Sequence, residues 1–196
     1  MLYEPDKVKL GSQLKAKYSY SLGSVIIMDF IDLVKKRYSV RAYKSIPVEK
    51  EKLNKVLEAA RLAPTANNRQ PLQILVVHTK RKKRKLLSIY PRGWFVQPPV
   101  VVCVCGDKDI AWVRKDGRCY LDVDVAIVMD YITLAATDLG LGTCFIAAFD
   151  AGHAREVLSL PDNLEPILFT PLGYPDDLPG IKKRKKLKEL VRYEHW

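Results

Sequence analysis

The sequence predicts a single α/β domain in which helices and strands are intermixed. The chain has 196 residues, of which 48% are hydrophobic and 28% charged, a composition typical of one globular domain with a sizeable core. Segments of helical period alternate with short apolar runs that lack internal alternation, as expected for strands covered on both faces. The order of these segments is too irregular for a plain doubly wound sheet.

The first half of the chain contains two predicted helices and two predicted strands. Residues 28–37, MDFIDLVKKR, form an amphipathic helical pattern. A second helix is predicted over 47–62, because Pro47 suits a first turn and Pro64 stops the pattern. The strands are expected at 72–79 and 99–105, where the apolar runs are rich in β-branched residues.

The second half centres on a long apolar helix predicted over 122–139, which ends at the helix-stopping Gly140. A shorter helix is predicted to begin after Asp150, whose carboxylate suits an N-cap. The remaining expected elements are a strand at 143–149, the end of the shorter helix at Leu160, a strand at 166–174, and a basic tail at 181–196 that is either a short helix or an arm.

The domain is expected to span residues 28–196, with 1–27 as an N-terminal extension of open role, because a sustained apolar period begins only at Met28. No segment reaches the roughly 20 uninterrupted apolar residues that a bilayer span needs. The start of the chain lacks the pattern of a secretory signal. A cytoplasmic location without membrane association is therefore expected.

The net charge of +11 comes from two short segments. The run KRKKRK at 80–85 and the tail 181–196 together account for the whole excess, so the rest of the chain is balanced. A basic cluster can bind a phosphate or steer an anionic ligand as well as grip a nucleic acid. No nucleic-acid partner is expected, because no aromatic residue is interleaved with the basic runs at 80–85 and 182–188 and no groove-entering motif is recognisable.

Cysteine and histidine do not form a recognisable metal-binding pattern. The cysteines lie at 103, 105, 119 and 144, and no pair has the C-x-x-C spacing that presents two thiolates to zinc. Cys103 and Cys105 are two apart in an apolar run, so on a strand they would point the same way into a core. No metal site is predicted.

Three segments in the body of the domain carry candidate chemistry. In R-Y-S-V-R at 37–41, an extended chain would place two guanidinium groups and a hydroxyl on one face, a suitable receptor for a phosphate dianion or simply an exposed strand. The loop A-P-T-A-N-N-R-Q-P at 63–71 offers amides for a planar polar ligand or for its own stabilisation. In G-L-G-T at 140–143, Gly142 would let the backbone approach a ligand closely.

Together with the basic tail, these segments resemble the FMN-dependent nitroreductase family. The resemblance rests on their order: R-x-S-x-R after the first helix, A-P-[ST]-x-x-N-x-Q-P, G-L-G-T before a strand, L-G-Y-P, and a K-x-R-x-x-L-x-E tail. It covers residues 28–196. It implies an α+β, three-layer α/β/α fold with a mixed, mainly antiparallel central sheet, and a homodimer with swapped C-terminal arms for which Tyr193 and Trp196 are suitable anchors.

The resemblance also implies a site for FMN, with NADH or NADPH as hydride donor and a small-molecule electron acceptor such as a nitroaromatic or a quinone. Flavin N5 would carry the chemistry in a ping-pong reaction, so no catalytic side chain is expected. The implied cofactor-binding residues are Arg37, Tyr38, Ser39 and Arg41 at the phosphate and ribityl chain, Pro64, Thr65, Ala66, Asn68 and Gln70 from the partner subunit, Gly142, Thr143, Ile146, Ala147 and Ala148 near the flavin N5 and O4 edge, and Lys182 and Arg184 returning to the phosphate.

Some positions depart from the family pattern. Leu72 replaces a large aromatic residue, Ala147 and Ala148 replace Glu-Gly, and 106–121 is too short for the helical excursion over the flavin of longer members. Substrate preference is therefore the property that the resemblance implies least. Three alternatives stay open: a flavin enzyme of the same fold that dehalogenates its substrate reductively or fragments its flavin, a flavin-sequestering protein without turnover, and, from a different class, a basic nucleic-acid-binding module.

Overall fold

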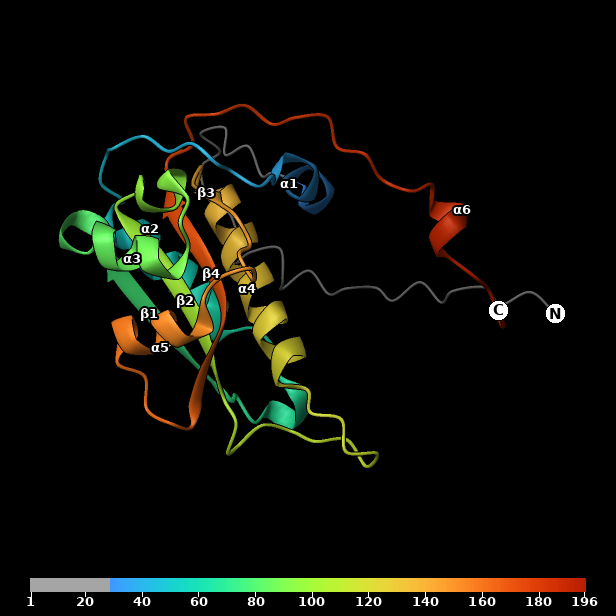
Figure 1. Ribbon diagram of the computed structural model, residues 1–196. Coiled ribbons are helices and arrows are strands. Elements are labelled where there is room, and N and C mark those ends of the chain that lie inside the picture. Colours follow the sequence, from blue (N-terminus) through green and yellow to red (C-terminus); the bar gives the residue numbers. More distant parts are fainter. Residues whose placement is uncertain (1–28) are drawn as a thin grey trace, which may run out of the picture.

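A four-stranded sheet forms the centre of the structure, a computed structural model that describes residues 29–196 (Figure 1). The predicted extension at 1–27 lies outside the described residues. The strand order is β1 (Leu72–His78), β2 (Val100–Asp107), β4 (Leu164–Gly173) and β3 (Gly142–Thr143), and every neighbouring pair is antiparallel. An isolated parallel bridge joins Ser39 to Thr143. The expected mainly antiparallel sheet is confirmed, and within residues 29–196 its parallel pairing is limited to this bridge.

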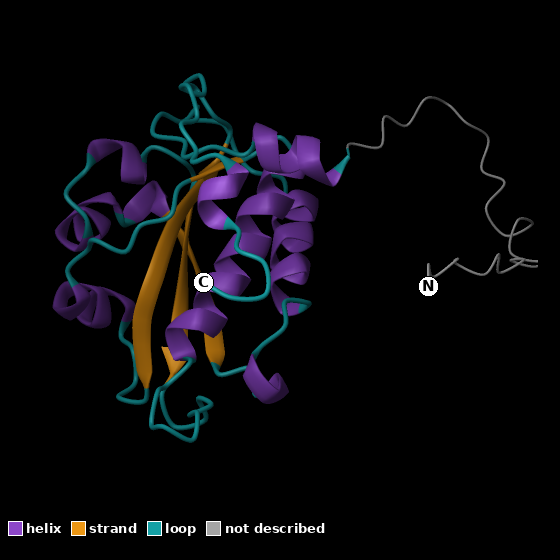
Figure 2. Ribbon diagram, turned by 90° about the vertical axis from the view of Figure 1, so that its right-hand side faces the viewer, coloured by secondary structure: helices purple, strands orange, loops and turns teal. Residues whose placement is uncertain are grey.

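Helices cover both faces of the sheet, which confirms the three-layer arrangement (Figures 1 and 2). Successive side chains of β2 point to opposite faces of the sheet and are buried on both. Val102 and Val104 pack in a core with residues of α2 and α4, whereas Cys103 and Cys105 pack with residues of α3 and α5. One face carries α1 (Phe30–Lys36), α2 (Lys50–Arg61) and α4 (Leu121–Asp138), and the other carries α3 (Lys83–Ile89) and α5 (Ala151–Leu158).

The strand predicted at 143–149 is wrong in its extent, because β3 contains only Gly142 and Thr143. Continued antiparallel pairing would place Cys144 opposite Pro171, which has no N–H to donate. The N–H of Cys144 instead donates to the Thr170 hydroxyl at 3.0 Å. Pairing resumes only at one isolated bridge, between Ile146 and Phe169.

The predicted helices are confirmed with small shifts of their ends. Asp150 caps α5, since its carboxylate accepts the N–H of His153 at 2.8 Å. The basic run 80–85 crosses the 3-10 helix η3 (Thr79–Arg81) and the start of α3. The remainder of α3 was not predicted. Its Leu86 and Ile89 are fully buried, so tertiary packing stabilises a helix too short to stand alone.

Helix α4 separates the two regions that matter for function. At about 1.5 Å per residue its 18 residues span roughly 27 Å. The 3-10 helix η2 (Ala66–Asn68) lies beside the N-terminal end of α4 (Figure 1). Strand β3 and the segment 37–41, which is bridged to it, lie at the C-terminal end of α4. The basic tail leaves the body and contains a four-residue helix, α6 (Leu187–Leu190). Within residues 29–196, no helix combines the length and apolar character needed to cross a membrane.

Candidate functional site

Segment 37–41 runs alongside β3 in an extended conformation. Val40 is buried, and its N–H donates to the Thr143 carbonyl at 2.9 Å. The alternation therefore leaves Arg37, Ser39 and Arg41 off the buried face, as the sequence pattern indicated. All three residues lie near the thiol of Cys144. The charges of Arg41 and Arg37 and a hydrogen bond from Ser39 each act to lower the pKa of this thiol.

The tail brings two further cations to this segment. Lys182 donates to the carbonyls of Val34 and Lys35 at the end of α1. Lys182 is exposed, but partial desolvation lowers the pKa of its amine, and the positive charges of Arg184 and Arg37 lower it further. Among the described residues, no carboxylate forms an ion pair with Arg37, Arg41, Lys182 or Arg184. These four residues are called the cation cluster below.

Two buried polar atoms beside the cation cluster lack partners among the described residues. They are Nε of Arg37 and Oγ1 of Thr143. Buried polar groups are normally hydrogen-bonded, and an exception needs an explanation. Unpaired cations next to unsatisfied donors form a receptor for an anion with several acceptor oxygens, such as a phosphate.

Cys144 was not predicted as a neighbour of the cation cluster. Its side chain is buried, and this burial raises the pKa of the thiol despite the opposing effects of Arg41, Ser39 and Arg37. The thiol is therefore held in its neutral form at neutral pH. Its position directly after Thr143 in G-L-G-T-C is the only sequence signal that could have indicated it.

Gly140 and Gly142 of the G-L-G-T motif are required for different structural reasons. Gly140 has φ of +74°, as a helix-terminating residue in the left-handed region does. A Cβ at Gly142 would lie 2.6 Å from Cγ2 of Val40. Gly142 is thus required by the close packing of segment 37–41 on β3, which differs from the expected approach to a ligand.

Asp177 holds the segment 37–41 in place through hydrogen bonds. This residue was not identified from the sequence. Its Oδ2 accepts the N–H of Arg41 at 2.7 Å. The Tyr38 hydroxyl donates to the Asp177 carbonyl at 2.8 Å and approaches its Oδ1 at 3.1 Å. Tyr38, predicted to contact the cofactor, therefore ties segment 37–41 to the loop that leads into the tail. The signal was weak, because Asp177 lies in the loop after L-G-Y-P without a recognisable spacing.

The ionisation of Tyr38 reports on this tie. Burial raises the pKa of Tyr38 to about 12, with contributions from the hydrogen bond to Asp177 and from its charge. The raised pKa contributes stability that is complete below the ordinary value near pH 10 and is lost as the pH rises through about 12. We expect Asp177→Asn to lower the pKa of Tyr38 but not to its ordinary value, because burial remains.

The measurement is an alkaline difference titration of tyrosinate absorbance. The Tyr38→Phe variant assigns the signal among the 10 tyrosines of the chain. A Tyr38 titration that is identical in Asp177→Asn and in the unchanged protein would contradict the assigned tie.

The loop 64–70 adopts an unusual backbone conformation. Asn67, Asn68 and Gln70 have φ of 52°, 52° and 51°. Asn tolerates this region, whereas it is uncommon for Gln. Internal hydrogen bonds hold the turn, since Thr65 Oγ1 accepts the Gln70 N–H at 3.0 Å and Gln70 Nε2 donates to the Asn68 carbonyl at 3.3 Å. The predicted residues Pro64, Asn68 and Gln70 are exposed, and Thr65 and Ala66 are half-buried.

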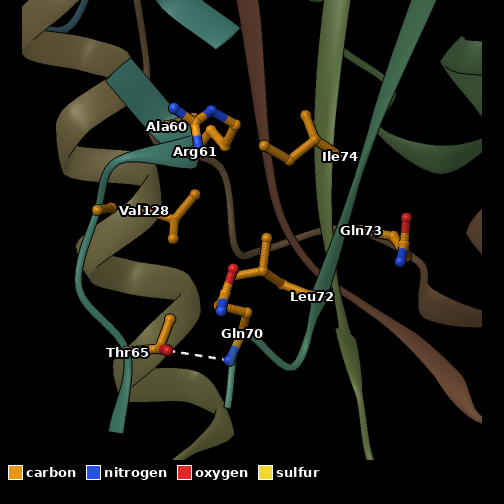
Figure 3. A pocket seen from close by; sticks show the side chains of 9 residues that line it. Ala60, Arg61, Thr65, Gln70, Leu72, Gln73, Ile74 and Val128 are labelled. Atoms are coloured by element: carbon orange, nitrogen blue, oxygen red, sulfur yellow. Dashed lines mark hydrogen bonds between the residues drawn. The ribbon is translucent and has the colours of Figure 1, made fainter. Parts of the chain in front are cut away.

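A cavity of about 330 Å³ opens beside this loop (Figure 3). Thr65 and Gln70 line it from the loop, Leu72 and Ile74 from the edge strand β1, and Val128 from α4. Its wall combines apolar side chains with a few polar groups, as is typical of a binding pocket. The polar groups are the amides of Gln70 and Gln73, the hydroxyl of Thr65 and the guanidinium of Arg61.

The chain after β3 offers two free backbone donors instead of three. Ile146 is buried, and its N–H donates to the Phe169 carbonyl at 2.9 Å, so the prediction that this amide faces a ligand is corrected. Ala147 and Ala148 are exposed, and their N–H groups have no protein acceptor within residues 29–196. They can donate to a ligand.

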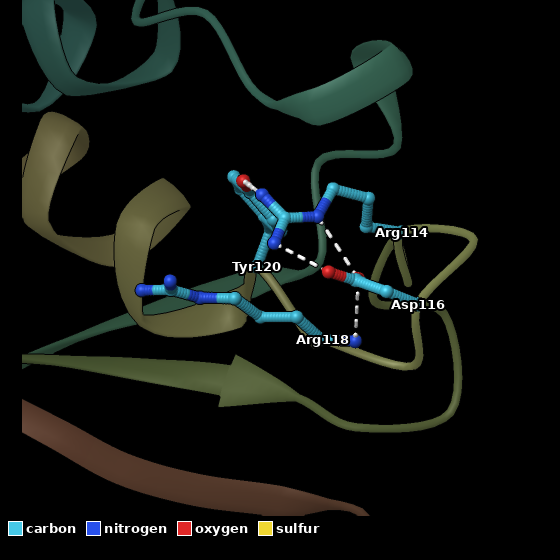
Figure 4. Close-up of polar contacts among 4 residues, drawn as sticks. All are labelled: Arg114, Asp116, Arg118 and Tyr120. Carbon is cyan, nitrogen blue, oxygen red and sulfur yellow. Dashed lines mark hydrogen bonds and ion pairs between the residues drawn. The ribbon is translucent and has the colours of Figure 1, made fainter.

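The interval 106–121 forms a hairpin without a helix, as its length indicated (Figure 4). Val113 and Cys119 form a bridge, and Arg114 binds both carboxylate oxygens of Asp116 and the hydroxyl of Tyr120. Arg69 of the loop donates to the Ala111 carbonyl at 3.3 Å. This hydrogen bond joins the hairpin to the loop near the N-terminal end of α4.

Apart from Ile146, Ala147 and Ala148 after β3, the predicted site residues fall into two groups at opposite ends of α4. The cation cluster, Ser39 and Thr143 lie at its C-terminal end, and the loop 64–70 lies beside its N-terminal end (Figure 1). These two groups lie apart in the structure of the single chain.

Comparisons with known proteins are consistent with this architecture. A model of the "Nitroreductase family" matches residues 34–99 and 90–174. The chain is 31% identical over 170 residues to a protein of Methanothermobacter thermautotrophicus named "Putative NADH dehydrogenase/NAD(P)H nitroreductase", covering 82% of this chain and 84% of that protein. It is 29% identical over 173 residues to the "FMN reductase [NAD(P)H]" of Bacillus subtilis, covering 80% of this chain and 69% of that protein.

Solved structures agree with the sequence comparisons. A nitroreductase family protein from Clostridium difficile superposes with a TM-score of 0.80 at 43% identity, covering 86% of this chain and all of that one. A putative NADH dehydrogenase/NAD(P)H nitroreductase from Bacteroides thetaiotaomicron superposes with a TM-score of 0.73 at 29% identity, covering 85% and 97%. The matched motifs, the three-layer fold and these likenesses together show that the chain belongs to the nitroreductase family.

Proposed function

We propose that this protein is an FMN-dependent oxidoreductase that transfers a hydride from NADH or NADPH to a flat, electron-poor acceptor such as a nitroaromatic or a quinone. The observation that carries the proposal is the cation cluster with the unsatisfied atoms Arg37 Nε and Thr143 Oγ1. The names of the relatives, NAD(P)H nitroreductase and FMN reductase, support an NAD(P)H-dependent flavin oxidoreductase.

The residues at the C-terminal end of α4 fit the phosphate of FMN. A phosphate supplies acceptor oxygens for the guanidinium groups of Arg37 and Arg41 and for the hydroxyls of Ser39 and Thr143. Its charge would also relieve the mutual repulsion that lowers the pKa of Lys182. In this role Lys182 and Arg184 close the phosphate site from the tail.

Other groups of the chain fit the ring system. The exposed amides of Asn68 and Gln70 can bind the polar edge of a flavin, and the free N–H groups of Ala147 and Ala148 can donate near N5. Bound FMN would supply the chemistry by accepting and returning a hydride. The chain would orient the ring, provide hydrogen-bond donors where negative charge develops, and leave one face open to donor and acceptor in turn.

The separation of the two residue groups supports a homodimer. One flavin cannot contact groups at both ends of a helix about 27 Å long in a single chain. A second subunit in two-fold arrangement would bring its loop 64–70 to the cation cluster of the first. An exposed apolar surface is available for this pairing, with Phe30 61% and Ile31 54% exposed on α1 and Val123 and Tyr131 each 39% exposed on α4.

The tail supports the swapped arm. Leu187, Leu190, Tyr193 and Trp196 are 74%, 63%, 81% and 98% exposed, and the segment leads away from the body (Figure 1). Side chains of this size are stabilised when they are buried against a partner. Within the described chain β1 is an edge strand, and the cavity of Figure 3 opens along it, so a surface exists that an arm could cover.

The direct test is an absorbance spectrum of the purified protein, followed by anaerobic addition of NADH and, in a second cuvette, of NADPH. We expect the two flavin bands between about 350 and 470 nm, and bleaching by at least one donor. Addition of a nitroaromatic or a quinone to the bleached protein should restore the bands.

Each failure has a distinct meaning. A protein that neither carries nor takes up FMN would overturn the proposal. Retention of FMN without bleaching would favour a flavin-sequestering protein. Bleaching that no nitroaromatic or quinone reverses would favour a related reaction, such as reductive dehalogenation or flavin fragmentation, which product analysis identifies.

A further inference from the structure

Asp124 is a buried carboxylate that the proposed chemistry does not use. It lies in the first turn of α4 and is 1% exposed, and no other charged residue within 29–196 is buried to this degree. Its Oδ1 accepts the N–H of Ala66 at 2.7 Å. Its Oδ2 is buried without a partner among the described residues.

This arrangement costs stability. A buried carboxylate is unfavourable unless its oxygens are paired, and here only one oxygen accepts a hydrogen bond. The position in the first turn of α4 offsets part of that cost, since the helix N-terminus favours negative charge. Local rules broken without a stabilising gain are found at functional sites.

The backbone that Asp124 holds is itself strained. Asn67, Asn68 and Gln70 all have positive φ, and such residues persist only where the surroundings over-determine them. The internal bonds of the loop fix its end, since Gln70 is tied to Thr65. The bond from Ala66 to Asp124 fixes its start to α4.

We propose that Asp124 is a positioning residue, whose carboxylate anchors the start of the loop 64–70 on α4 and so holds the strained turn that presents Asn68 and Gln70 to the flavin of the partner subunit. The inference rests on the proposed function for its flavin. The anchoring itself is a property of this chain alone.

The test combines three variants in the full chain. Asp124→Ala removes the acceptor, whereas Asp124→Asn keeps an oxygen that can accept the Ala66 N–H. Ala66→Pro removes the donor from the other side. Proline fits there, because Thr65 has φ −133° and ψ 159°, as a residue before proline prefers, and Ala66 opens a 3-10 turn. The exposed Asp109→Ala is the matched control.

Two quantities are measured: the FMN dissociation constant of each folded variant, and the hydrogen-exchange rate of the Ala66 amide in flavin-free protein. We expect Asp124→Ala to weaken FMN binding at least tenfold and to accelerate the exchange, with Asp124→Asn recovering most of both. Asp124→Ala and Ala66→Pro should not add, since they break one bond from its two ends. Asp109→Ala should change neither quantity.

The outcomes separate the inference from the proposed function. Unchanged FMN binding in both Asp124→Ala and Ala66→Pro, or additive effects, would overturn the role of Asp124 and leave the flavin proposal intact. An unchanged protein that binds no FMN would overturn the flavin proposal, and with it the positioning role toward a flavin. The exchange rate of Ala66 would still decide the anchoring. Should Asp124→Ala fail to fold, Ala66→Pro decides, because it keeps the Asp124 side chain and those around it in place and removes only the N–H that Asp124 accepts.

Discussion

Replacing both Arg37 and Arg41 by alanine is expected to yield a folded protein that purifies without FMN. Hydrogen bonds to charged groups each contribute about 1.5–3 kcal/mol. Loss of both guanidinium groups should therefore weaken FMN binding by about a hundredfold or more. The ratio of flavin absorbance to protein absorbance after purification, and a titration with added FMN, measure the effect.

A matched control separates contact from overall charge. Arg81→Ala with Arg84→Ala removes the same charge from the basic run at η3 and α3, where both arginines are exposed and far in sequence from Arg37 and Arg41. If attraction of the anionic cofactor by net charge were the cause, both double variants would lose FMN to a similar extent. Full FMN content in the Arg37/Arg41 double variant would refute the phosphate assignment.

Deletion of residues 186–196 is expected to convert a dimer into a monomer. The deleted segment carries Leu187, Leu190, Tyr193 and Trp196, whose burial against a partner would each contribute about 1.5–3 kcal/mol. Even half of the lower total raises the dimer dissociation constant by at least a hundredfold. Sedimentation velocity over a range of concentrations measures this, and the deletion leaves Lys182 and Arg184 in place.

The control for this deletion is a full-length chain with Lys183→Ala and Lys185→Ala, which alters the charge of the tail but keeps its apolar residues. It should sediment as the unchanged protein does. A truncated chain that remains dimeric would show that the tail is not an arm on the partner. A monomeric full-length protein with bound FMN would contradict the dimer as a whole.

Much of the fold could be predicted because local pattern and tertiary packing agree. The helix predicted over 122–139 matches α4 within one residue at each end, since its apolar period, Gly140 and burial all favour the same segment. The strand predicted at 143–149 could not be shortened from sequence. Its pairing fails because of Pro171, a residue that lies far along the chain and becomes its neighbour only in the fold.

In the candidate site, too, the features set by local sequence could be predicted and those set by distant residues could not. Alternation in 37–41 placed Arg37, Ser39 and Arg41 correctly relative to the buried Val40, since strand geometry alone determines it. Asp177 and Asp124 could not be recognised, because each acts on a backbone N–H of a segment distant in sequence. The sequence marks Gly142 as a position of close approach. The group that approaches it is the side chain of Val40, a contact that only the folded structure reveals.

Because the loop 64–70 and the cation cluster lie at opposite ends of α4, the proposed dimer would make FMN binding depend on protein concentration. In the proposed dimer each FMN site is built from residues of both chains. Dimerisation and FMN binding are therefore linked equilibria. FMN would then tighten the pairing of the subunits, and dilution would release FMN. The amount of chain present would set the fraction that is competent for catalysis.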